Sequence, residues 1–252
     1  MTSPPILLTS SVIAYDTGVA LSDTEERTRL ALESVAQWLQ INPNLSLVLC
    51  DGSSFDFGNL VAEHFPLANI ECLCFENNQE LVKKYGRGYG EGEIVRYALH
   101  HSKLIAMAGC FTKCTSKLWV KNYKQCLSNW NNTLLCKGVF LNVFSPFKKT
   151  QFSYIDTRFY ITSIATYTEY FEDAHLGIDV HLGRSLEDRF FDIFAINHIQ
   201  KALFSVAPII EGVGGGIGFY YKNPLKRRIK ESLRLQLVRR NKLFSELFVD
   251  LT

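Results

Sequence analysis

The 252-residue sequence lacks several patterns that would assign a function directly. No stretch reaches 18 apolar residues, the length that a membrane-spanning helix needs, and no basic segment with a long apolar run opens the chain. It contains no Gly-x-Ser-x-Gly elbow, Walker loop or dinucleotide fingerprint. With no internal repeat or low-complexity linker either, the chain is expected to form one cytoplasmic globular domain.

Metal and disulfide frameworks are equally poorly supported. The seven cysteines form an odd set, and neither Cys72-x-Cys74 nor Cys110-x3-Cys114 has zinc-ribbon spacing. Asp179 and His181 could bind a metal, and His175 is nearby in the sequence. The spacing of these residues does not provide a suitable third ligand. We therefore expect reduced cysteines near the core of a cytosolic protein.

The charge is unevenly distributed along the chain. Residues 222–242 contain nine basic residues and one acidic residue, a net charge of +8, whereas the whole chain carries +2. An acidic body with a basic end segment indicates an anionic partner for that segment.

The first half alternates apolar runs with helical periodicity. Strands are predicted at residues 6–12, 45–50, 70–75 and 102–107, and a helix begins near Asp23. This order predicts a mainly parallel α/β sheet. Polar residues follow the first two strands, where such sheets bind ligands: Thr9, Ser10, Asp51 and Ser53.

A glycine-rich segment follows the third predicted strand. Glycine occupies positions 86, 88, 90 and 92, beside Glu91, and helical periodicity follows. We predict a loop that leads into a helix over residues 91–101, with Gly86, Gly88, Gly90 and Glu91 near a bound anion.

The second half has a different pattern. Extended segments are predicted at 111–122, 134–144 and 152–161, helices at 163–171 and 185–199, and a second glycine-rich loop at 211–218. We divide the domain, residues 1–221, into a nucleotide-binding half (1–122) and an acceptor half (123–221). Residues 222–252 are expected to form a basic amphipathic segment.

Several motifs together resemble one family. They are Leu8-Thr9-Ser10-Ser11, Asp51-Gly52-Ser53, the 85–91 segment, Phe111-Thr112-Lys113-Cys114-Thr115-Ser116-Lys117, Asp156-Thr157-Arg158-Phe159 and Glu187-Asp188-Arg189. The chain resembles bacterial-type sugar-nucleotide glycosyltransferases with a GT-A-like fold, of the lipopolysaccharide or capsule type. The resemblance implies that a sugar moves from a nucleotide donor to a surface-glycan or lipid-linked acceptor.

The sequence departs from that family in one important respect. It has no Asp-x-Asp, the motif that holds a divalent metal in such enzymes, and Ser116-Lys117 stands where Gly-Arg is frequent. The sequence thus has no motif that supports a metal site, although a divalent metal stays an alternative, and no other cofactor is indicated. Lys113 and Lys117 are candidates for neutralising the leaving phosphate instead. An inactive transferase fold and a sugar nucleotidyltransferase remain the alternatives.

Glycosyl transfer needs a carboxylate to deprotonate the acceptor hydroxyl. The candidates are Asp156, Glu187 and Glu211, although Asp156 can equally pair with Arg158, Glu187 can begin a solvated helix and Glu211 can end a strand. Asp51 is interpreted as a contact to the base or ribose, or alternatively as part of an Asx turn with Gly52 and Ser53.

The end segment is predicted to form a helix over residues 224–248 with an apolar arc and a basic opposite side. Such a helix can bind the inner face of an anionic membrane. The alternative is that the apolar arc packs on the domain. Nucleic acid is not an expected partner, because no aromatic stacking residues are interleaved with the charges.

Overall fold

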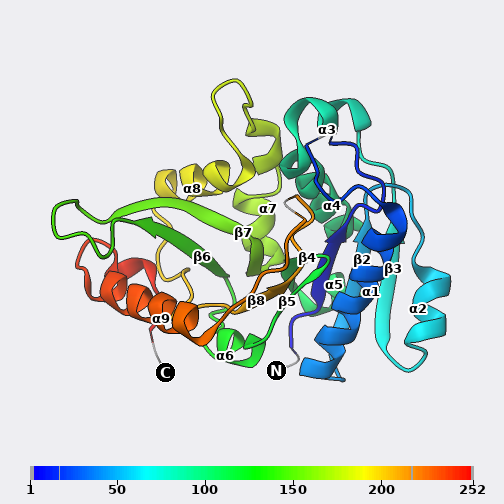
Figure 1. The fold of residues 1–252 in the computed structure, drawn as a ribbon, viewed down its shortest axis with the longest axis horizontal. Coiled ribbons are helices and arrows are strands. Elements are labelled where there is room, and N and C mark those ends of the chain that lie inside the picture. The colour runs from blue at the N-terminus through cyan, green and yellow to red at the C-terminus, as the bar shows by residue number, and fades with distance from the viewer. Residues whose placement is uncertain (1–2, 17, 217, 251–252) are drawn as a thin grey trace.

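The computed structural model describes residues 3–16, 18–216 and 218–250. Residues 1–2, Ile217 of the predicted 211–218 loop, and residues 251–252 of the predicted end segment lie outside this set. A six-stranded sheet in the order β3-β2-β1-β4-β7-β6 forms the centre (Figure 1). Strands β1 to β4 are parallel to one another. Strand β7 is antiparallel to both of its neighbours, β4 and β6. The predicted mainly parallel α/β sheet is confirmed.

The strands of this sheet are β1 (Ile6–Ser10), β2 (Ser46–Asp51), β3 (Asn69–Cys74), β4 (Cys110–Thr115), β6 (Leu134–Leu141) and β7 (Gln151–Ser163). A separate two-stranded sheet pairs β5 (Leu118–Val120) with β8 (Ile210–Gly212). The helices are α1 (Thr24–Ile41), α2 (Gly58–His64), α3 (Gln79–Tyr85), α4 (Arg87–His101), α5 (Lys103–Ala108), α6 (Tyr123–Leu127), α7 (Ile164–Tyr170), α8 (Leu186–Ile196) and α9 (Leu225–Arg240). Two short 3₁₀ helices, η1 (Ala174–Gly177) and η2 (Ser245–Leu247), complete the fold.

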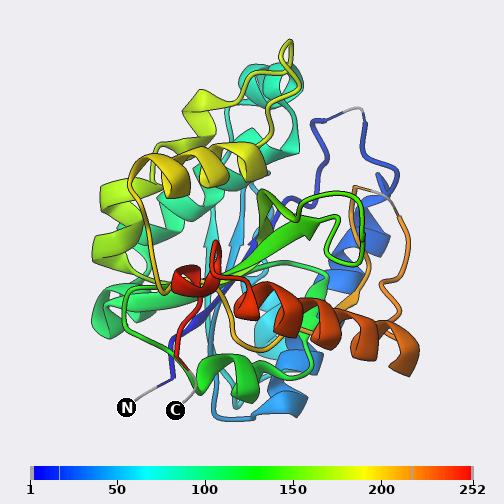
Figure 2. The ribbon, with the colours of Figure 1, turned by 90° about the vertical axis from the view of Figure 1, so that its left-hand side faces the viewer.

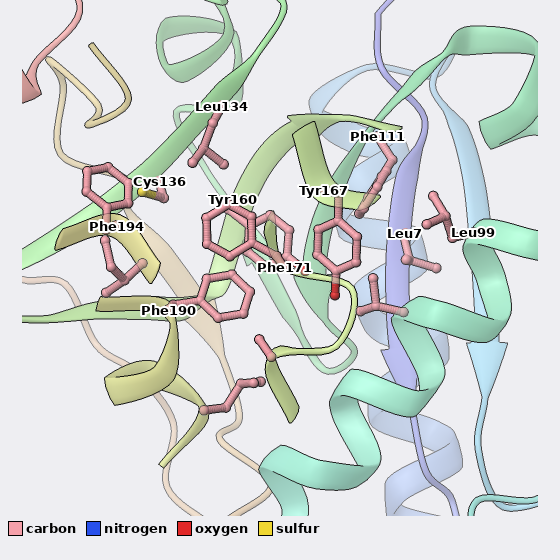
Figure 3. Close-up of a cluster of buried hydrophobic side chains, with 14 of the residues drawn as sticks. Leu7, Leu99, Phe111, Leu134, Cys136, Tyr160, Tyr167, Phe171, Phe190 and Phe194 are labelled. Atoms are coloured by element: carbon pink, nitrogen blue, oxygen red, sulfur yellow. The ribbon is translucent and has the colours of Figure 1, made fainter. Parts of the chain in front are cut away.

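Helices cover both faces of the sheet (Figure 2). Alternate residues of each strand point to opposite faces, so Leu7 packs in one core cluster and Leu8 in the other. The cluster in Figure 3 joins β1 and β7 to helices α4, α7 and α8. The other cluster contains buried residues of α1, among them Trp38, which is fully buried. These two cores hold the carboxyl ends of β1 and β4 in fixed positions.

The fourth predicted strand, 102–107, is wrong, because this segment begins helix α5. The Ser102 hydroxyl caps the helix by accepting a hydrogen bond from the Ile105 amide at 3.1 Å. The Glu71 carboxylate accepts bonds from the Lys103 and Leu104 amides at 2.9 and 3.2 Å. Since these contacts satisfy the first amides of a helix, the segment turns, and the strand follows after Gly109 as β4.

The predicted glycine loop is also largely wrong. Helix α4 begins at Arg87 and includes Gly88, Gly90 and Gly92, so only Gly86, with φ +82°, has a conformation typical of a turn. A Cβ on Gly90 would lie 2.9 Å from the Asn77 amide nitrogen, and one on Gly92 would overlap the His175 side chain. These glycines therefore allow close packing of α4 against its neighbours.

The end segment differs from the prediction in length. Helix α9 ends at Arg240, and Phe248 beyond it is buried. Within α9, however, Leu225, Ile229 and Leu237 are 68%, 52% and 47% exposed. In the part of the chain that the structure describes, no helix has the length and apolar character needed to span a bilayer.

Candidate functional site

A cavity of about 470 Å³ opens at the carboxyl ends of β1 and β4. Its walls include the end of β1 and the following segment, the start of α4, the turn after β4, the pair Thr157 and Arg158 of β7, and the start of α8. Arg27 of α1, Asn77 and residues of α3 also contribute. Gly214, Gly215 and Gly216 close it from the second glycine-rich segment. The two glycine-rich segments of the sequence thus meet at one cavity.

The second glycine segment leaves no space for side chains. A Cβ on Gly216 would overlap the Arg87 guanidinium, and one on Gly215 would lie 3.2 Å from Lys117 Cε. The Ala20 and Leu21 amides donate to the Gly216 and Gly215 carbonyls at 3.2 and 3.4 Å. The segment therefore brings backbone close to the Arg87 and Lys117 cations.

Lys117 provides a buried cation at this cavity. Its side chain is in the turn after β4, its φ is +73°, and the residue is 4% exposed. The ammonium donates to the Ser116 hydroxyl at 3.2 Å. Burial and the nearby charge of Arg27 lower the pKa of Lys117 to about 7, although Asp51 acts in the opposite direction. No carboxylate among the described residues forms an ion pair with it.

Arg27 fixes the wall that follows β1. Its guanidinium donates to the carbonyls of Ser11 and, at 2.7 Å, Leu21, so it bridges the two ends of this segment from helix α1. The sequence analysis missed it. Its position could have been predicted, because Arg27 precedes Leu30 and Ala31 by one turn and therefore lies on the buried face of the predicted helix.

Three polar atoms in the wall have no partner in the described structure. They are Thr9 Oγ1, Ser10 Oγ and Asn77 Oδ1, and their residues are at most 4% exposed. A buried polar atom without a hydrogen bond is costly, by about 1–3 kcal/mol, so such atoms in a cavity wall are suited to a polar ligand. Thr9 and Ser10 were predicted. Asn77 follows β3 and was missed, although the same rule of polar residues after strands applies to it.

Asp51 and Ser53 are outside this cavity. The Asp51 carboxylate accepts hydrogen bonds from the Val12, Ser53 and Phe55 amides at 2.9, 2.7 and 3.2 Å, and from the Ser53 hydroxyl at 2.6 Å. Asp51 is fully buried. These contacts correspond to the Asx-turn alternative and correct the interpretation of Asp51 and Ser53 as donor contacts.

Lys113 is likewise not placed to contact a phosphate. It is fully buried, forms an ion pair with Glu91 at 2.5 Å and donates to the Thr157 carbonyl at 2.8 Å. Glu91 does line the cavity, where it also accepts a bond from the Thr115 hydroxyl at 3.1 Å. Lys113 therefore holds Glu91 in position.

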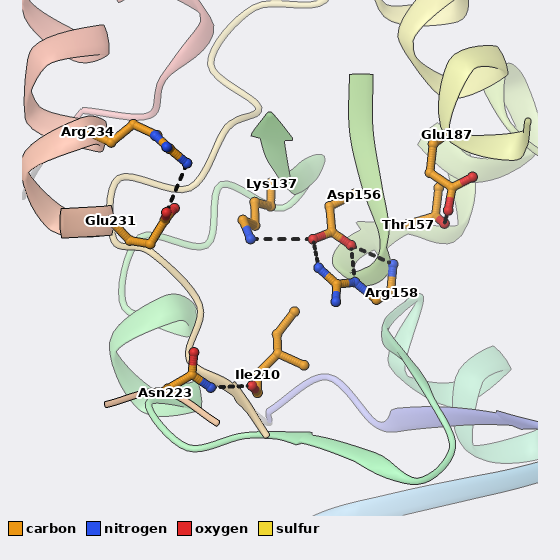
Figure 4. A network of polar contacts seen from close by, with 9 residues as sticks. All are labelled: Lys137, Asp156, Thr157, Arg158, Glu187, Ile210, Asn223, Glu231 and Arg234. Atoms are coloured by element: carbon orange, nitrogen blue, oxygen red, sulfur yellow. Dashed lines mark hydrogen bonds and ion pairs between the residues drawn. The ribbon is translucent and has the colours of Figure 1, made fainter. Parts of the chain in front are cut away.

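The three candidate catalytic carboxylates have different surroundings, and Figure 4 shows two of them, Asp156 and Glu187. Asp156 is buried between Arg158 and Lys137; burial alone would raise its pKa, but the hydrogen bonds and charge of Arg158 and the charge of Lys137 hold the pKa below its usual range. It positions Arg158, whose guanidinium lies 4.9 Å over the Tyr221 ring at the cavity wall. The alternative for Asp156, a pair with Arg158, thus matches the structure.

Glu187 lines the cavity, whereas Glu211 does not. The Glu187 carboxylate accepts a hydrogen bond from the Thr157 hydroxyl at 3.2 Å and lies in the first turn of α8, which is capped by Ser185 (Figure 4). Glu211 lies in β8, 3.8 Å from Lys121. Of the three predicted carboxylates, Glu187 is the one that can reach a ligand in the cavity.

The turn after β4 does not provide a donor set for a divalent metal. The residues of this turn are Thr115, Ser116 and Lys117, and Lys117 lines the cavity. Across residues 3–16, 18–216 and 218–250, no three His, Cys, Asp or Glu side chains gather in a way that could hold a metal ion. A cation is thus present at this turn, but it is a lysine.

No protein-family model matches the chain, and no curated protein matches its sequence. Solved structures with a similar fold include a candidate nucleotide-diphospho-sugar transferase of Desulfovibrio desulfuricans G20 (9% identity, 99% of this chain, 100% of that chain, TM-score 0.47). An active-site variant of LgtC is similar over 75% of this chain and 69% of its own (8% identity, TM-score 0.46). A 4-diphosphocytidyl-2C-methyl-D-erythritol synthase covers 94% of this chain and 100% of its own (12% identity, TM-score 0.43). The function proposed below is argued from the cavity.

Proposed function

We propose that the protein is a glycosyltransferase that uses a nucleotide sugar as donor. The observation that carries the proposal is the cavity at the ends of β1 and β4, which brings together the buried Lys117 cation, the Gly214–Gly216 backbone and the Glu187 carboxylate. Such a cavity can stabilise a departing phosphate on one side and activate a hydroxyl on the other.

The nucleoside of the donor would occupy the part of the cavity nearest β1. Thr9, Ser10 and Asn77 offer the polar atoms without partners there, which can bind ribose or base. The phosphates would lie against Lys117, Arg87 and the backbone of the glycine segment. Because a buried cation interacts more strongly with a phosphate than an exposed one, Lys117 is the main electrostatic contact.

In the transfer step, Glu187 takes the proton of an acceptor hydroxyl. The acceptor oxygen forms a bond to the anomeric carbon, and the bond from that carbon to the phosphate oxygen breaks. The electron pair of the broken bond stays on the nucleotide phosphate, beside Lys117 and Arg87. Glu91 is not assigned this role, because the Lys113 ammonium already forms an ion pair with its carboxylate at 2.5 Å.

We further propose that the acceptor is a lipid-linked or surface glycan and that the enzyme works at the inner, cytoplasmic face of a membrane. This is supported by the exposed leucines and the basic residues of α9, which begins four residues after Tyr221 of the cavity wall. A sugar nucleotidyltransferase would use the same cavity to bind a nucleotide, but the reaction would release pyrophosphate.

The test is a thermal-unfolding screen with UDP-, GDP-, dTDP- and CMP-sugars, with and without manganese. We expect one donor class to stabilise the protein by about 2.7 kcal/mol at 100 times its dissociation constant. The Lys117→Met variant should lose most of this shift, and Lys121→Met, which changes an exposed lysine outside the cavity, should retain it. If no nucleotide sugar shifts the transition, the proposal is wrong, and pyrophosphate release from a nucleoside triphosphate and a sugar phosphate would favour the nucleotidyltransferase.

A further inference from the structure

Helix α9 turns its apolar row away from the domain. The exposed row consists of Leu225, Ile229, Leu233 and Leu237, which are spaced four residues apart and are 47–68% exposed. Val238, on the other side of the helix, is 1% exposed and belongs to the core. Since residues four apart lie on the same helix face, the four side chains form one continuous apolar stripe in solvent.

Basic residues border this stripe. Lys226, Lys230 and Arg240 are all exposed, and the segment 222–242 carries +8. An exposed apolar stripe with cationic borders matches an anionic lipid surface, where acyl chains cover the apolar residues and headgroups neutralise the charge.

A second element, distant in sequence, lies beside α9. The loop between β6 and β7 lies near the helix in both ribbon views (Figures 1 and 2). The Lys230 ammonium and the Arg234 guanidinium lie 5.8 and 5.7 Å from the centre of the Phe144 ring. These cation–π contacts connect the loop to the helix.

The loop presents a large aromatic side chain to solvent. Phe147 is 95% exposed and precedes Lys148 and Lys149, so the loop has the same combination of apolar and basic residues as α9. The Ser145 hydroxyl accepts hydrogen bonds from the Phe147 and Lys148 amides at 3.3 and 3.0 Å. This turn holds the Phe147 side chain out from the domain.

We propose that the stripe of α9 and the tip of the β6–β7 loop form one surface that binds an anionic lipid bilayer, with Phe147 inserting among the headgroups. The inference extends the membrane location in the proposed function to a second element. It can be tested without a nucleotide sugar, so failure of the proposed glycosyl transfer leaves it intact.

The experiment is co-sedimentation of the full chain with vesicles of phosphatidylcholine containing about 30% phosphatidylglycerol. Phe147→Ser and Ile229→Ser should each lower the partition coefficient about tenfold, because each removes a large apolar group from the bilayer interface. The double variant Lys148→Gln/Lys149→Gln should weaken binding about fivefold for each charge at low salt. Pure phosphatidylcholine vesicles should bind the wild-type chain much less.

The matched control is Leu67→Ser, which removes an apolar side chain that is 99% exposed. Leu67 follows α2, and Figure 1 shows α2 at the opposite end of the molecule from α9. All three serine variants change solvent-exposed residues, so circular dichroism should show a native fold. Loss of binding in the Phe147 and Ile229 variants together with a normal Leu67 variant supports the proposal. The proposal is overturned if either the Phe147 or the Ile229 variant binds as the wild type does, or if the Leu67 control loses as much binding. It is also overturned if binding depends on the lysines alone, as expected of a site for RNA or another polyanion.

Discussion

Lys117 shows how one residue acquires a property that its sequence neighbours lack. It is four residues after Lys113, and both are buried. Lys113 has a carboxylate partner in Glu91, whereas the strongest charge near Lys117 is the cation Arg27. Burial and, in second place, the Arg27 charge lower the pKa of Lys117 to about 7, so the charge of Lys117 depends on what the cavity binds.

This lowered pKa predicts a pH-dependent affinity for the donor. A bound phosphate favours charged Lys117, and above pH 7 the ligand-free protein must first take up a proton. The affinity should therefore be highest below pH 7 and fall by up to about tenfold per pH unit above it. Calorimetric titration between pH 6 and 9 measures this dependence. In Lys117→Met the affinity should be low and nearly independent of pH, and a flat profile for the wild-type chain would contradict the assignment.

The same shift has a consequence for stability. The folded state binds the Lys117 proton only below about pH 7, whereas the unfolded chain retains it up to the ordinary value of 10.5. The unfolded state thus binds more protons between these values, so this group makes stability rise with pH across that window.

At the scale of elements, helix α4 is shaped by the glycines within it. Gly88, Gly90 and Gly92 lower its intrinsic helix propensity, yet the helix forms because they let it approach Leu186, Asn77 and His175. Packing therefore outweighs local propensity at this helix. Gly86, Gly88 and Gly90, which were predicted from the sequence, line the cavity at the start of α4, and those inside the helix also let it pack closely on its neighbours.

We expect Gly92→Ala to destabilise the protein by about 1–3 kcal/mol, since the new Cβ would overlap the His175 side chain. Helix propensity alone predicts a gain of about 1 kcal/mol from the same change. Urea denaturation gives the sign directly. Gly58→Ala, at the first residue of α2, is the control, because its Cβ would meet only the flexible Asp56 side chain. A Gly92→Ala variant as stable as the wild type would show that His175 can move away at little cost.

At the scale of the whole molecule, the cavity joins the two halves of the chain. The walls proposed to bind the nucleotide come mainly from β1, α4 and the turn after β4, whereas Glu187 comes from α8 in the second half. Donor binding and proton transfer are therefore expected to be separable by mutation.

Glu187→Gln should leave the donor dissociation constant within about twofold of the wild type, because it keeps the size of the side chain and removes only its ability to take a proton. The transfer rate should fall by about 100-fold or more. Glu211→Gln, which changes a carboxylate outside the cavity, should retain full activity. The two measurements are donor titration and transfer to a glycan acceptor. A full rate in the Glu187 variant would exclude Glu187 as the base.

The sequence by itself determined the features that depend on local chemistry. The strands β1, β2 and β3, the Asp23 cap of α1 and the polar residues after β1 follow from apolar periodicity and from the hydrogen-bonding preferences of short polar side chains. The parallel order of the sheet follows because such strands are joined by helical crossovers. The odd cysteine set also matches the structure, in which all seven are free.

Only the tertiary structure decided which of several equivalent residues reaches the cavity. The two lysines Lys113 and Lys117 are alike in type and local pattern, but Lys113 is paired with Glu91. The carboxylates Glu187 and Glu211 are also alike, but Glu211 lies beside Lys121 in β8, whereas Glu187 accepts a hydrogen bond from Thr157 at the cavity. The same holds for α9, whose apolar row could face the core or the solvent; the core places there are taken by residues such as Phe248 and Val238. Burial and pairing depend on long-range contacts, and no local pattern contains that information.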